Sequence, residues 1–203
     1  EKETITIVFQ TVGASTERMS ALQAGDSFRD VVGPLGNPSD FVKEDIEELK
    51  KKKYLFVAGG VGTAPVYPQV KWLKEHGIDA DVIMGSKTKD LLILEDEMKA
   101  VAGNLYVTTD DGSYGIKGYV STVIDGFDWT PDAVYSCGAP GMLKYVDSKF
   151  ENHPHAYVSM EARMACGMGA CYACVVHVKG ESDAKNLRVC EEGPVFPTGK
   201  VIV

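Results

Sequence analysis

The sequence lacks long apolar runs, internal repeats, low-complexity tracts and any surplus of positive charge. No segment approaches the roughly eighteen consecutive apolar residues that a membrane-spanning helix needs, so we expect no membrane span. The formal net charge of −8 argues against nucleic acid as a partner. Hydrophobic residues make up 44% of the 203 positions, which is enough for one or two domains with a buried core.

Signals for export are missing too. The sequence starts at Glu1 in place of an initiator methionine, and its first residues do not form the basic and apolar segments of a signal peptide. Five cysteines without an export signal predict a reducing, cytoplasmic environment. The four histidines show neither metal-ligand nor catalytic-triad spacing, so we expect them to be surface or packing residues.

Four cysteines near the end of the chain follow the order C-x4-C-x2-C-x15-C, and they are Cys166, Cys171, Cys174 and Cys190. This is the ligand spacing of a plant-type [2Fe–2S] cluster, in which the fourth thiolate comes from a distant segment. Small residues between the first three let the backbone wrap closely and aim its N–H groups at the sulfurs. The sequence therefore predicts an iron–sulfur centre that transfers single electrons.

Other chemistries remain as alternatives for these cysteines. A structural zinc site usually combines two short knuckles, whereas this sequence has one C-x2-C, and His177 falls outside the zinc spacing. A disulfide framework is typical of small secreted proteins. Three methionines near the cysteines are expected to fill gaps around the cluster, namely Met160, Met164 and Met168.

The first forty residues predict part of an antiparallel sheet. Residues 4–10 alternate apolar and polar side chains, and residues 27–32 form a second candidate strand after a Gly-Asp turn. Two strands are marginal by themselves, so we expect further strands from a partner or from a longer chain of which this sequence is a part. The missing methionine favours the longer chain. A charged helix is expected over residues 41–53.

From residue 54 onwards the pattern predicts alternating strands and helices. The expected strands cover residues 54–58, 81–84, 105–108, 133–136 and 156–160. The expected helices cover residues 65–76, 94–102, 119–124 and 142–150, with Gly77 as a cap of the first. This order predicts an α/β fold whose parallel sheet is covered by helices on both faces.

Three glycine-rich loops follow strands of the predicted sheet, at the edge where such folds bind ligands. In the first, residues 59–65, glycines let the backbone approach a pyrophosphate, and Thr63 is a candidate N-cap of the next helix. Pro65 replaces the third glycine of the usual dinucleotide fingerprint, so a tight turn without a ligand stays an alternative. The other two loops cover residues 109–118 and 136–142.

The loop sequences GGVGTAP, TDDGSYGIKG and CGAPGM resemble the nicotinamide-binding domain of the ferredoxin–NADP reductase superfamily. Together with SMEARMACGMGACYACVVHV, they resemble one branch of it. That branch contains the electron-transfer subunit of dihydroorotate dehydrogenase and the small subunits of sulfide dehydrogenase and of the NADH-dependent ferredoxin:NADP oxidoreductase. The segments TITIVFQTVGAST and MGSKTKDLLILEDEM look closer to the latter two. The resemblance covers essentially all 203 residues.

The resemblance implies a role for each candidate site residue. The dinucleotide pyrophosphate would contact Gly60, Gly62, Thr63 and Pro65. The same cleft would be lined by Asp111 and Gly112. The nicotinamide would lie beside Gly138, Met142 and the catalytic residue Cys137, which helps to place the ring against a flavin. Without the resemblance, a buried cysteine acting as a small hydrophobe is the alternative for Cys137. The FAD pyrophosphate would contact the segment that contains Gly13 and Thr16.

The resemblance also implies a domain order. It comprises the remnant of an FAD-binding β-barrel (residues 1–40), a linker helix (41–53), an NAD(P)-binding domain (54–158) and a [2Fe–2S] domain (159–203). Family members carry a further N-terminal stretch that completes the barrel and includes an Arg-x-x-[ST] motif for FAD. That stretch is not among these residues. FAD is therefore expected in the intact protein, while these 203 residues contain only part of its site.

The sequence thus predicts an electron-transfer subunit of a flavin and iron–sulfur oxidoreductase. It would pass electrons between NAD(H) or NADP(H), FAD and a [2Fe–2S] cluster, to or from a larger partner subunit. The resemblance favours NAD(H), although a lysine in residues 85–89 could pair with a 2′-phosphate. The alternatives are an electron-transfer subunit of dihydroorotate dehydrogenase and a non-catalytic iron–sulfur carrier. The three glycine loops argue against the carrier, which needs no nucleotide site.

Overall fold

The computed structural model describes residues 4–182 and 185–203, and the chain divides into two compact units, Glu1–Pro34 and Leu35–Val203. Within the first unit, the described residues contain one helix, α1 (Ala14–Ser20), which begins after Gly13. The Thr16 hydroxyl accepts the backbone N–H of Gly13 at 3.1 Å and donates to the carbonyl of the same residue at 2.9 Å. These local hydrogen bonds fix the start of the helix.

The prediction of two strands in this first unit is wrong. Residues 4–10 and 27–32 are extended or irregular, and neither is assigned as a strand. A strand must satisfy its backbone N–H and C=O groups across a ladder, and no strand lies among the described residues 4–34 to provide one. Alternating side chains are therefore not enough to form a sheet here.

The second unit is built on a seven-stranded sheet in the order β4-β3-β2-β1-β5-β6-β9. Neighbouring strands from β4 to β6 are parallel, and β9 pairs with β6 in the antiparallel direction. The strands of this sheet are β1 (Tyr54–Gly59), β2 (Ala80–Ser86), β3 (Leu105–Thr109), β4 (Ile116–Lys117), β5 (Ala133–Cys137), β6 (Ala156–Ser159) and β9 (Val195–Pro197).

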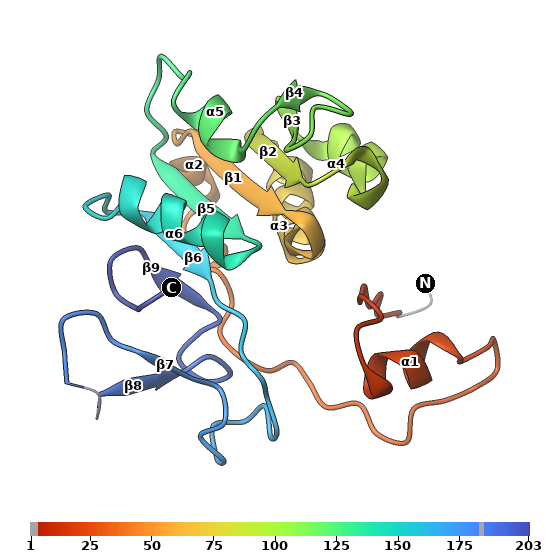
Figure 1. Cartoon of the computed structure of the whole chain (residues 1–203). Coiled ribbons are helices and arrows are strands. Elements are labelled where there is room, and N and C mark those ends of the chain that lie inside the picture. Colours follow the sequence, from red (N-terminus) through yellow and green to blue (C-terminus); the bar gives the residue numbers. More distant parts are fainter. Residues whose placement is uncertain (1–3, 183–184) are drawn as a thin grey trace. The chain divides into compact units, whose positions relative to one another are not determined.

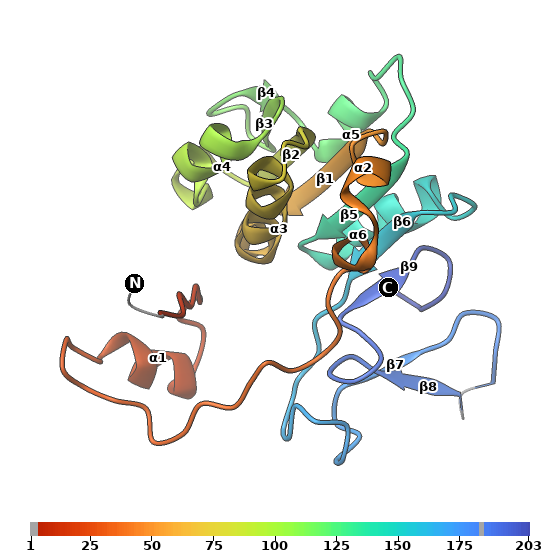
Figure 2. The same cartoon turned by 180° about the vertical axis from the view of Figure 1, so that it is seen from behind.

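Helices cover both faces of this sheet. The α-helices of the unit are α2 (Ile46–Leu49), α3 (Thr63–Glu75), α4 (Glu95–Val101), α5 (Val120–Ile124) and α6 (Pro140–Lys149). The short 3₁₀ helices are η1 (Asp40–Lys43), η2 (Gly60–Gly62) and η3 (Lys89–Leu91). Figure 1 shows the face that carries α5 and α6, and Figure 2 shows the opposite face with α2, α3 and α4.

Two clusters of buried side chains fill the space between the sheet and the helices on its two faces. Successive side chains of β1 belong alternately to one cluster and to the other. Leu55 and Val57 pack with residues of α5 and α6, whereas Phe56 and Ala58 pack with residues of α2, α3 and α4. All four side chains are fully buried. Because successive residues of a strand point to opposite faces, a continuous apolar strand is what a sheet covered on both sides requires. The predicted fold class is confirmed.

The expected strands and helices after residue 54 all exist, with ends shifted by a few residues. Gly77 follows α3 with a φ of +75°, and the N–H of Ile78 donates to the Leu73 carbonyl at 2.9 Å, which closes the helix end as expected. The prediction of one helix over residues 41–53 is wrong. The carboxylate of Asp45 accepts the N–H of Glu47 and starts α2, so this segment forms two short helices.

The C-terminal segment adds a second, two-stranded antiparallel sheet of β7 (Val175–His177) and β8 (Asn186–Arg188). It is joined to the main sheet through β9, where Val195 pairs with Ser159 of β6. Phe196 of β9 is 1% exposed and packs into the cluster beneath α5 and α6. The cysteine-bearing segment is therefore anchored on the same sheet that carries the glycine loops.

Candidate functional site

The first and third glycine loops meet at the switch point of the parallel sheet. The chain runs from β1 outward to β2 and β3 and then returns to β5 on the other side of β1. Ligands of such sheets bind beyond the carboxyl ends of the strands at this point. Gly59 ends β1 and Cys137 ends β5, so the first and third predicted loops lie at this point.

In the first loop, the backbone is tightly packed at Gly62 and accessible at Gly60. A Cβ on Gly62 would lie 2.3 Å from the carbonyl oxygen of Cys137, so only glycine permits this close approach. Gly60 has a φ of +54° and no atom within 4 Å of its Cβ position. The backbone of Gly60 is therefore accessible to a ligand, whereas Gly62 locks the loop onto β5.

The start of α3 differs from the prediction at Thr63. This residue is the first of the helix and is 2% exposed, so the expectation that it is the N-cap is wrong. Gly62 occupies the N-cap position and offers no side-chain oxygen. Pro65 lies in the first turn and is exposed. No side chain caps the start of α3, which is the arrangement that lets a helix N-terminus accept a phosphate, although the N–H of Thr63 already donates to the carbonyl of Gly60 and Pro65 has none.

Met142 brings the first and third loops together. A Cβ on Gly59 would lie 2.8 Å from the Met142 sulfur, and a Cβ on Gly138 would lie 2.8 Å from its terminal methyl and 2.9 Å from the Cα of Gly59. The two backbones therefore touch, and the thioether packs over both. The structure places Gly138 and Met142 beside the loop that contains Gly60, and their contact with a nicotinamide stays a prediction.

Cys137 is buried at the end of β5, in register with Ala58 of β1 and Ser159 of β6. Burial raises the pKa of its thiol to about 11, and a hydrogen bond with Ser159 opposes the shift in part. The thiol is therefore neutral near pH 7 and is not poised as a nucleophile. A neutral side chain at this position can shape a ring site but does not attack a substrate.

Asp111 and Gly112 lie farther along the same sheet edge, after β3. The Asp111 carboxylate accepts the N–H and the hydroxyl of Ser113 at 2.9 and 2.7 Å, and these bonds lower the pKa of the carboxyl. The Ser113 hydroxyl also accepts the N–H of Lys89, which follows β2, at 2.9 Å. The second loop is thus tied to the end of β2, and β2 separates it from the loop of β1.

The four clustered cysteines are arranged as two pairs of sulfurs. Cys174 and Cys190 are 3% and 6% exposed, and their sulfurs lie 3.3 Å apart. The thiols of Cys166 and Cys171 are hydrogen-bonded to one another, and Cys171 is exposed. No group of three His, Cys, Asp or Glu side chains in residues 4–182 and 185–203 could hold a single metal ion. A [2Fe–2S] cluster needs two thiolates on each iron, whereas a structural zinc ion needs four ligands around one centre. Two separate pairs of sulfurs therefore match the cluster better than they match zinc.

Backbone N–H groups around the cysteines donate hydrogen bonds to the sulfurs. The N–H of Met168 donates to the Cys166 sulfur at 3.4 Å. This bond makes the largest contribution to lowering the pKa of Cys166 to about 6, and hydrogen bonds with Cys171 make the next largest. The N–H of Gly169 donates to the Cys190 sulfur at 3.2 Å. The hydrogen bond with Cys174 and burial raise the pKa of the Cys190 thiol overall, while the Gly169 N–H lowers it. Because the thiolate is the form that binds iron, these N–H groups favour the ligating state.

The remaining predicted residues have other surroundings. Met164 and Met168 are 51% and 61% exposed, so the expectation that they fill gaps is wrong for these two, whereas Met160 packs against the core beneath α5 and α6. Gly13 and Thr16 lie at the start of α1 in the N-terminal unit, and their contact with FAD stays a prediction. None of the described helices is long and apolar enough to span a membrane.

The sequence reasoning missed Arg188 and two acidic neighbours of the fourth cluster cysteine. The guanidinium of Arg188 forms ion pairs with Glu191 and Glu192 and a hydrogen bond with the carbonyl of Gly169. An arginine two residues before Cys190 and two glutamates directly after it were the available signal. Spacing alone did not show that these charges face the first cysteine loop.

Comparisons with known proteins agree with both sites. Residues 161–202 match the iron–sulfur cluster binding domain of dihydroorotate dehydrogenase B, and residues 56–148 match the oxidoreductase NAD-binding domain. The chain is 65% identical over 202 residues to the dihydroorotate dehydrogenase B (NAD(+)) electron transfer subunit of Streptococcus thermophilus. It is 54% identical over 203 residues to that of Streptococcus mutans. Each alignment covers all of this chain and 76% of the relative.

Two solved structures share the fold. That of an NADH-dependent reduced ferredoxin–NADP oxidoreductase has a TM-score of 0.80 and 34% identity, over 96% of this chain and 67% of the other. The cytochrome b5 reductase domain of Ulva prolifera nitrate reductase has a TM-score of 0.54 at 21% identity, over 72% and 63% of the two chains, and shows likeness in fold alone.

The fold and the two sites define an electron-transfer protein of the ferredoxin-reductase type with an NAD-binding domain and an iron–sulfur domain. The chain belongs to the family of dihydroorotate dehydrogenase B electron transfer subunits. The recognised superfamily branch is confirmed. Within that branch, the sequence looked closer to the ferredoxin:NADP and sulfide dehydrogenase members. The relatives at 65% and 54% identity carry the dihydroorotate dehydrogenase name instead.

Proposed function

We propose that this chain exchanges electrons between NAD(H) and a larger oxidoreductase subunit in the cytoplasm. A flavin and a [2Fe–2S] cluster, when bound, supply the chemistry that no side chain here provides, because the flavin takes up the two electrons of a hydride and the cluster carries one at a time. Gly13 and Thr16 are the proposed contacts of the FAD. The choice of NAD(H) over NADP(H) is supported by the relatives named for NAD(+).

One structural feature carries this proposal. Ala58, Cys137, Ser159 and Val195 form a continuous register row across β1, β5, β6 and β9. Ala58 directly precedes Gly59, the last residue of β1, Cys137 ends β5 at the third glycine loop, and Val195 follows the cluster cysteine Cys190 by five residues. A hydrogen-bonded sheet thus joins the strand ends of the proposed nucleotide site to the cysteine segment within one compact unit. Electron transfer between bound carriers depends on such fixed positions.

The proposed roles of the residues follow from their surroundings. The open backbone of Gly60 and the uncapped start of α3 would hold the pyrophosphate, with Asp111 and Gly112 farther along the edge. Gly138, Met142 and the neutral thiol of Cys137 would shape the nicotinamide site. The two pairs of cysteine sulfurs would ligate the cluster.

The test of this function uses the full-length protein purified anaerobically. We expect bound iron, acid-labile sulfide and flavin, and a loss of the flavin and cluster absorption when NADH is added. Cys171→Ser should lose the iron, because the pair formed by Cys166 and the exposed Cys171 then has one thiolate. Cys137→Ala is the matched control and should keep the iron. A wild-type protein with zinc but no sulfide, or one with a cluster and no response to NADH, contradicts the proposal.

We further propose that the partner is a dihydroorotate-oxidising subunit, because the named relatives are subunits of dihydroorotate dehydrogenase B. The structural likeness at a TM-score of 0.80 favours a ferredoxin–NADP oxidoreductase partner as the second candidate. Purification from the native host separates the two. With the first partner, dihydroorotate should reduce the complex and NAD⁺ should reoxidise it. Reduction by reduced ferredoxin but not by dihydroorotate identifies the second.

A further inference from the structure

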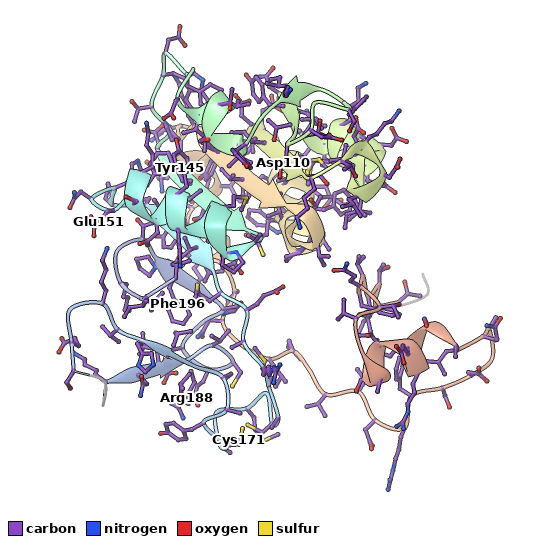
Figure 3. All side chains as sticks on the ribbon, in the orientation of Figure 1. Asp110, Tyr145, Glu151, Cys171, Arg188 and Phe196 are labelled. Carbon is purple, nitrogen blue, oxygen red and sulfur yellow. The ribbon has the colours of Figure 1, made fainter. Side chains whose placement is uncertain are left out.

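Arg188 connects the two segments that carry the cluster cysteines. Its Nη1 donates to the carbonyl oxygen of Gly169, in the first cysteine loop, at 2.7 Å. The same nitrogen lies 2.8 Å from a carboxylate oxygen of Glu191, and Nη2 lies 2.5 Å from one of Glu192. The Arg188 side chain is 20% exposed, whereas those of Glu191 and Glu192 are 49% and 34% exposed, so the guanidinium is the most buried group of this network. Figure 3 labels Arg188 and Cys171 in this part of the chain.

Gly169 links the arginine to a cluster sulfur. Its carbonyl accepts from Arg188, while its N–H donates to the sulfur of Cys190 at 3.2 Å. A Cβ at this position would lie 1.5 Å from a carboxylate oxygen of Glu191, so a side chain here would displace that carboxylate, and the φ of +78° also favours glycine. The orientation of the Gly169 backbone therefore depends on the guanidinium on one side and the sulfur on the other.

Tyr172 adds a second contact between the segments. Its φ is +57°, an uncommon conformation for a bulky residue that persists only where the surroundings impose it. The carbon at the centre of the Arg188 guanidinium lies 5.0 Å from the centroid of the Tyr172 ring. This is within the range of a cation–π contact. The arginine thus contacts the loop at its carbonyl and at its aromatic ring.

We propose that Arg188 is a positioning residue that raises the reduction potential of the cluster by holding the Gly169 N–H on the Cys190 sulfur and by placing a positive charge at the Gly169 carbonyl. The inference rests on the proposed cluster. Reduction adds a negative charge, which a hydrogen bond to sulfur and a nearby cation both stabilise. Arg188 also offsets the charges of Glu191 and Glu192, which by themselves disfavour reduction.

Replacement of the arginine tests the charge and the shape of its side chain separately. In Arg188→Gln, the cluster potential should fall by at least the equivalent of a tenfold change in the ratio of reduced to oxidised cluster, which is about 59 mV for one electron. In Arg188→Lys, the charge remains but the planar fork is lost, so the fall should be smaller. The potential is measured by a redox titration of the anaerobic full-length holoprotein followed by electron paramagnetic resonance.

Matched variants distinguish this role from a structural one. Lys185→Gln removes the same charge from the same segment, but Lys185 pairs with Glu181, so the potential should stay at the wild-type value. Glu192→Gln removes a negative charge and should shift the potential in the opposite direction, upwards. If Arg188→Gln does not retain a cluster, Glu192→Gln and Arg188→Lys decide the question.

Two results overturn the inference. One is a wild-type potential in every loaded variant, and the other is a fall in Lys185→Gln equal to that in Arg188→Gln. A wild-type protein that binds no cluster at all is a different failure, because it contradicts the proposed function rather than the role of Arg188.

Discussion

Two glycines of one loop have opposite environments at the end of β1. Gly62 contacts the backbone of Cys137 so closely that no Cβ fits, while Gly60 faces open space. The same residue type therefore serves packing at one position and access at another. Identity of the residues alone does not distinguish the two, since both occur within the same GGVG sequence.

Gly62→Ala should destabilise the protein by at least about 2 kcal/mol, because the new methyl group collides with a carbonyl that belongs to the central sheet. Urea unfolding followed by circular dichroism measures the change. Gly141→Ala is the matched control: Gly141 lies in α6 with no atom within 4 Å of its Cβ position, so alanine there should be neutral or stabilise by roughly 0.5–1 kcal/mol. Equal stabilities of the two variants contradict the argument.

Tyr54 illustrates a buried polar atom without a partner. The residue is 2% exposed, and its hydroxyl has no hydrogen-bond partner among the described residues. Burial raises the pKa of Tyr54 to about 12, with further contributions from the charges of Glu44 and Asp132. The hydroxyl therefore stays protonated in the folded state at pH values where an unfolded tyrosine ionises.

Tyr54→Phe should raise the free energy of unfolding by about 1 kcal/mol at pH 7, because it removes an unsatisfied buried hydroxyl. The stability due to the raised pKa is complete below pH 10 and is lost as the pH rises from about 10 to 12. Wild-type stability should fall more steeply over this range than that of the variant, as measured by urea unfolding at each pH. Tyr119→Phe, at a residue 67% exposed, should change neither quantity.

At the scale of elements, the short strand β9 decides where the cysteine segment lies. It contains three residues, one of them Pro197, and its pattern is too brief to predict as a strand from sequence. In the structure it pairs with β6 and buries Phe196 in the core (Figure 3). The long, periodic elements were predictable, whereas the helix expected over residues 41–53 failed because Asp45 starts a new helix within it.

Phe196→Ala should cost about 3–5 kcal/mol, since it leaves a cavity in the cluster beneath α5 and α6. Loss of this anchor should also let a chelator remove iron faster than from the wild-type holoprotein. Chemical unfolding and the rate of iron release measure the two effects. Ile202→Ala, at a residue 58% exposed in the same C-terminal segment, should change stability by less than about 0.5 kcal/mol. Iron release that is equally fast in both variants would falsify the anchoring role.

At the scale of the whole molecule, the buried core belongs to one of the two units. None of the described residues 4–34 is buried, whereas buried hydrophobic residues occur from Phe41 to Val201. The segment that begins at Leu35 contacts the cysteine region: the Asn37 side chain donates to the carbonyl of Glu191. The unit Leu35–Val203 therefore contains the elements that stabilise both candidate sites.

A chain that starts at Leu35 should unfold with a free energy within about 1 kcal/mol of that of the 203-residue chain and should retain its iron, because the deletion removes no buried side chain. The comparison uses urea unfolding and iron analysis of anaerobically prepared protein. The control is a chain that starts at Lys43, which also loses the buried Phe41 and should be clearly less stable. A large loss of stability in the first chain contradicts the division into units.

The sequence by itself determined the alternating order of strands and helices, the glycine loops and the cysteine spacing, because each depends on residues close together in the chain. The tertiary structure decided which of these meet. Strand order brings Gly59 to Gly138, and the pairing of β6 with β9 attaches the cysteine segment to the sheet. The contact of Arg188 with Gly169 joins residues that are nineteen positions apart. Such contacts result from packing and hydrogen bonding between distant segments, which local sequence patterns do not encode.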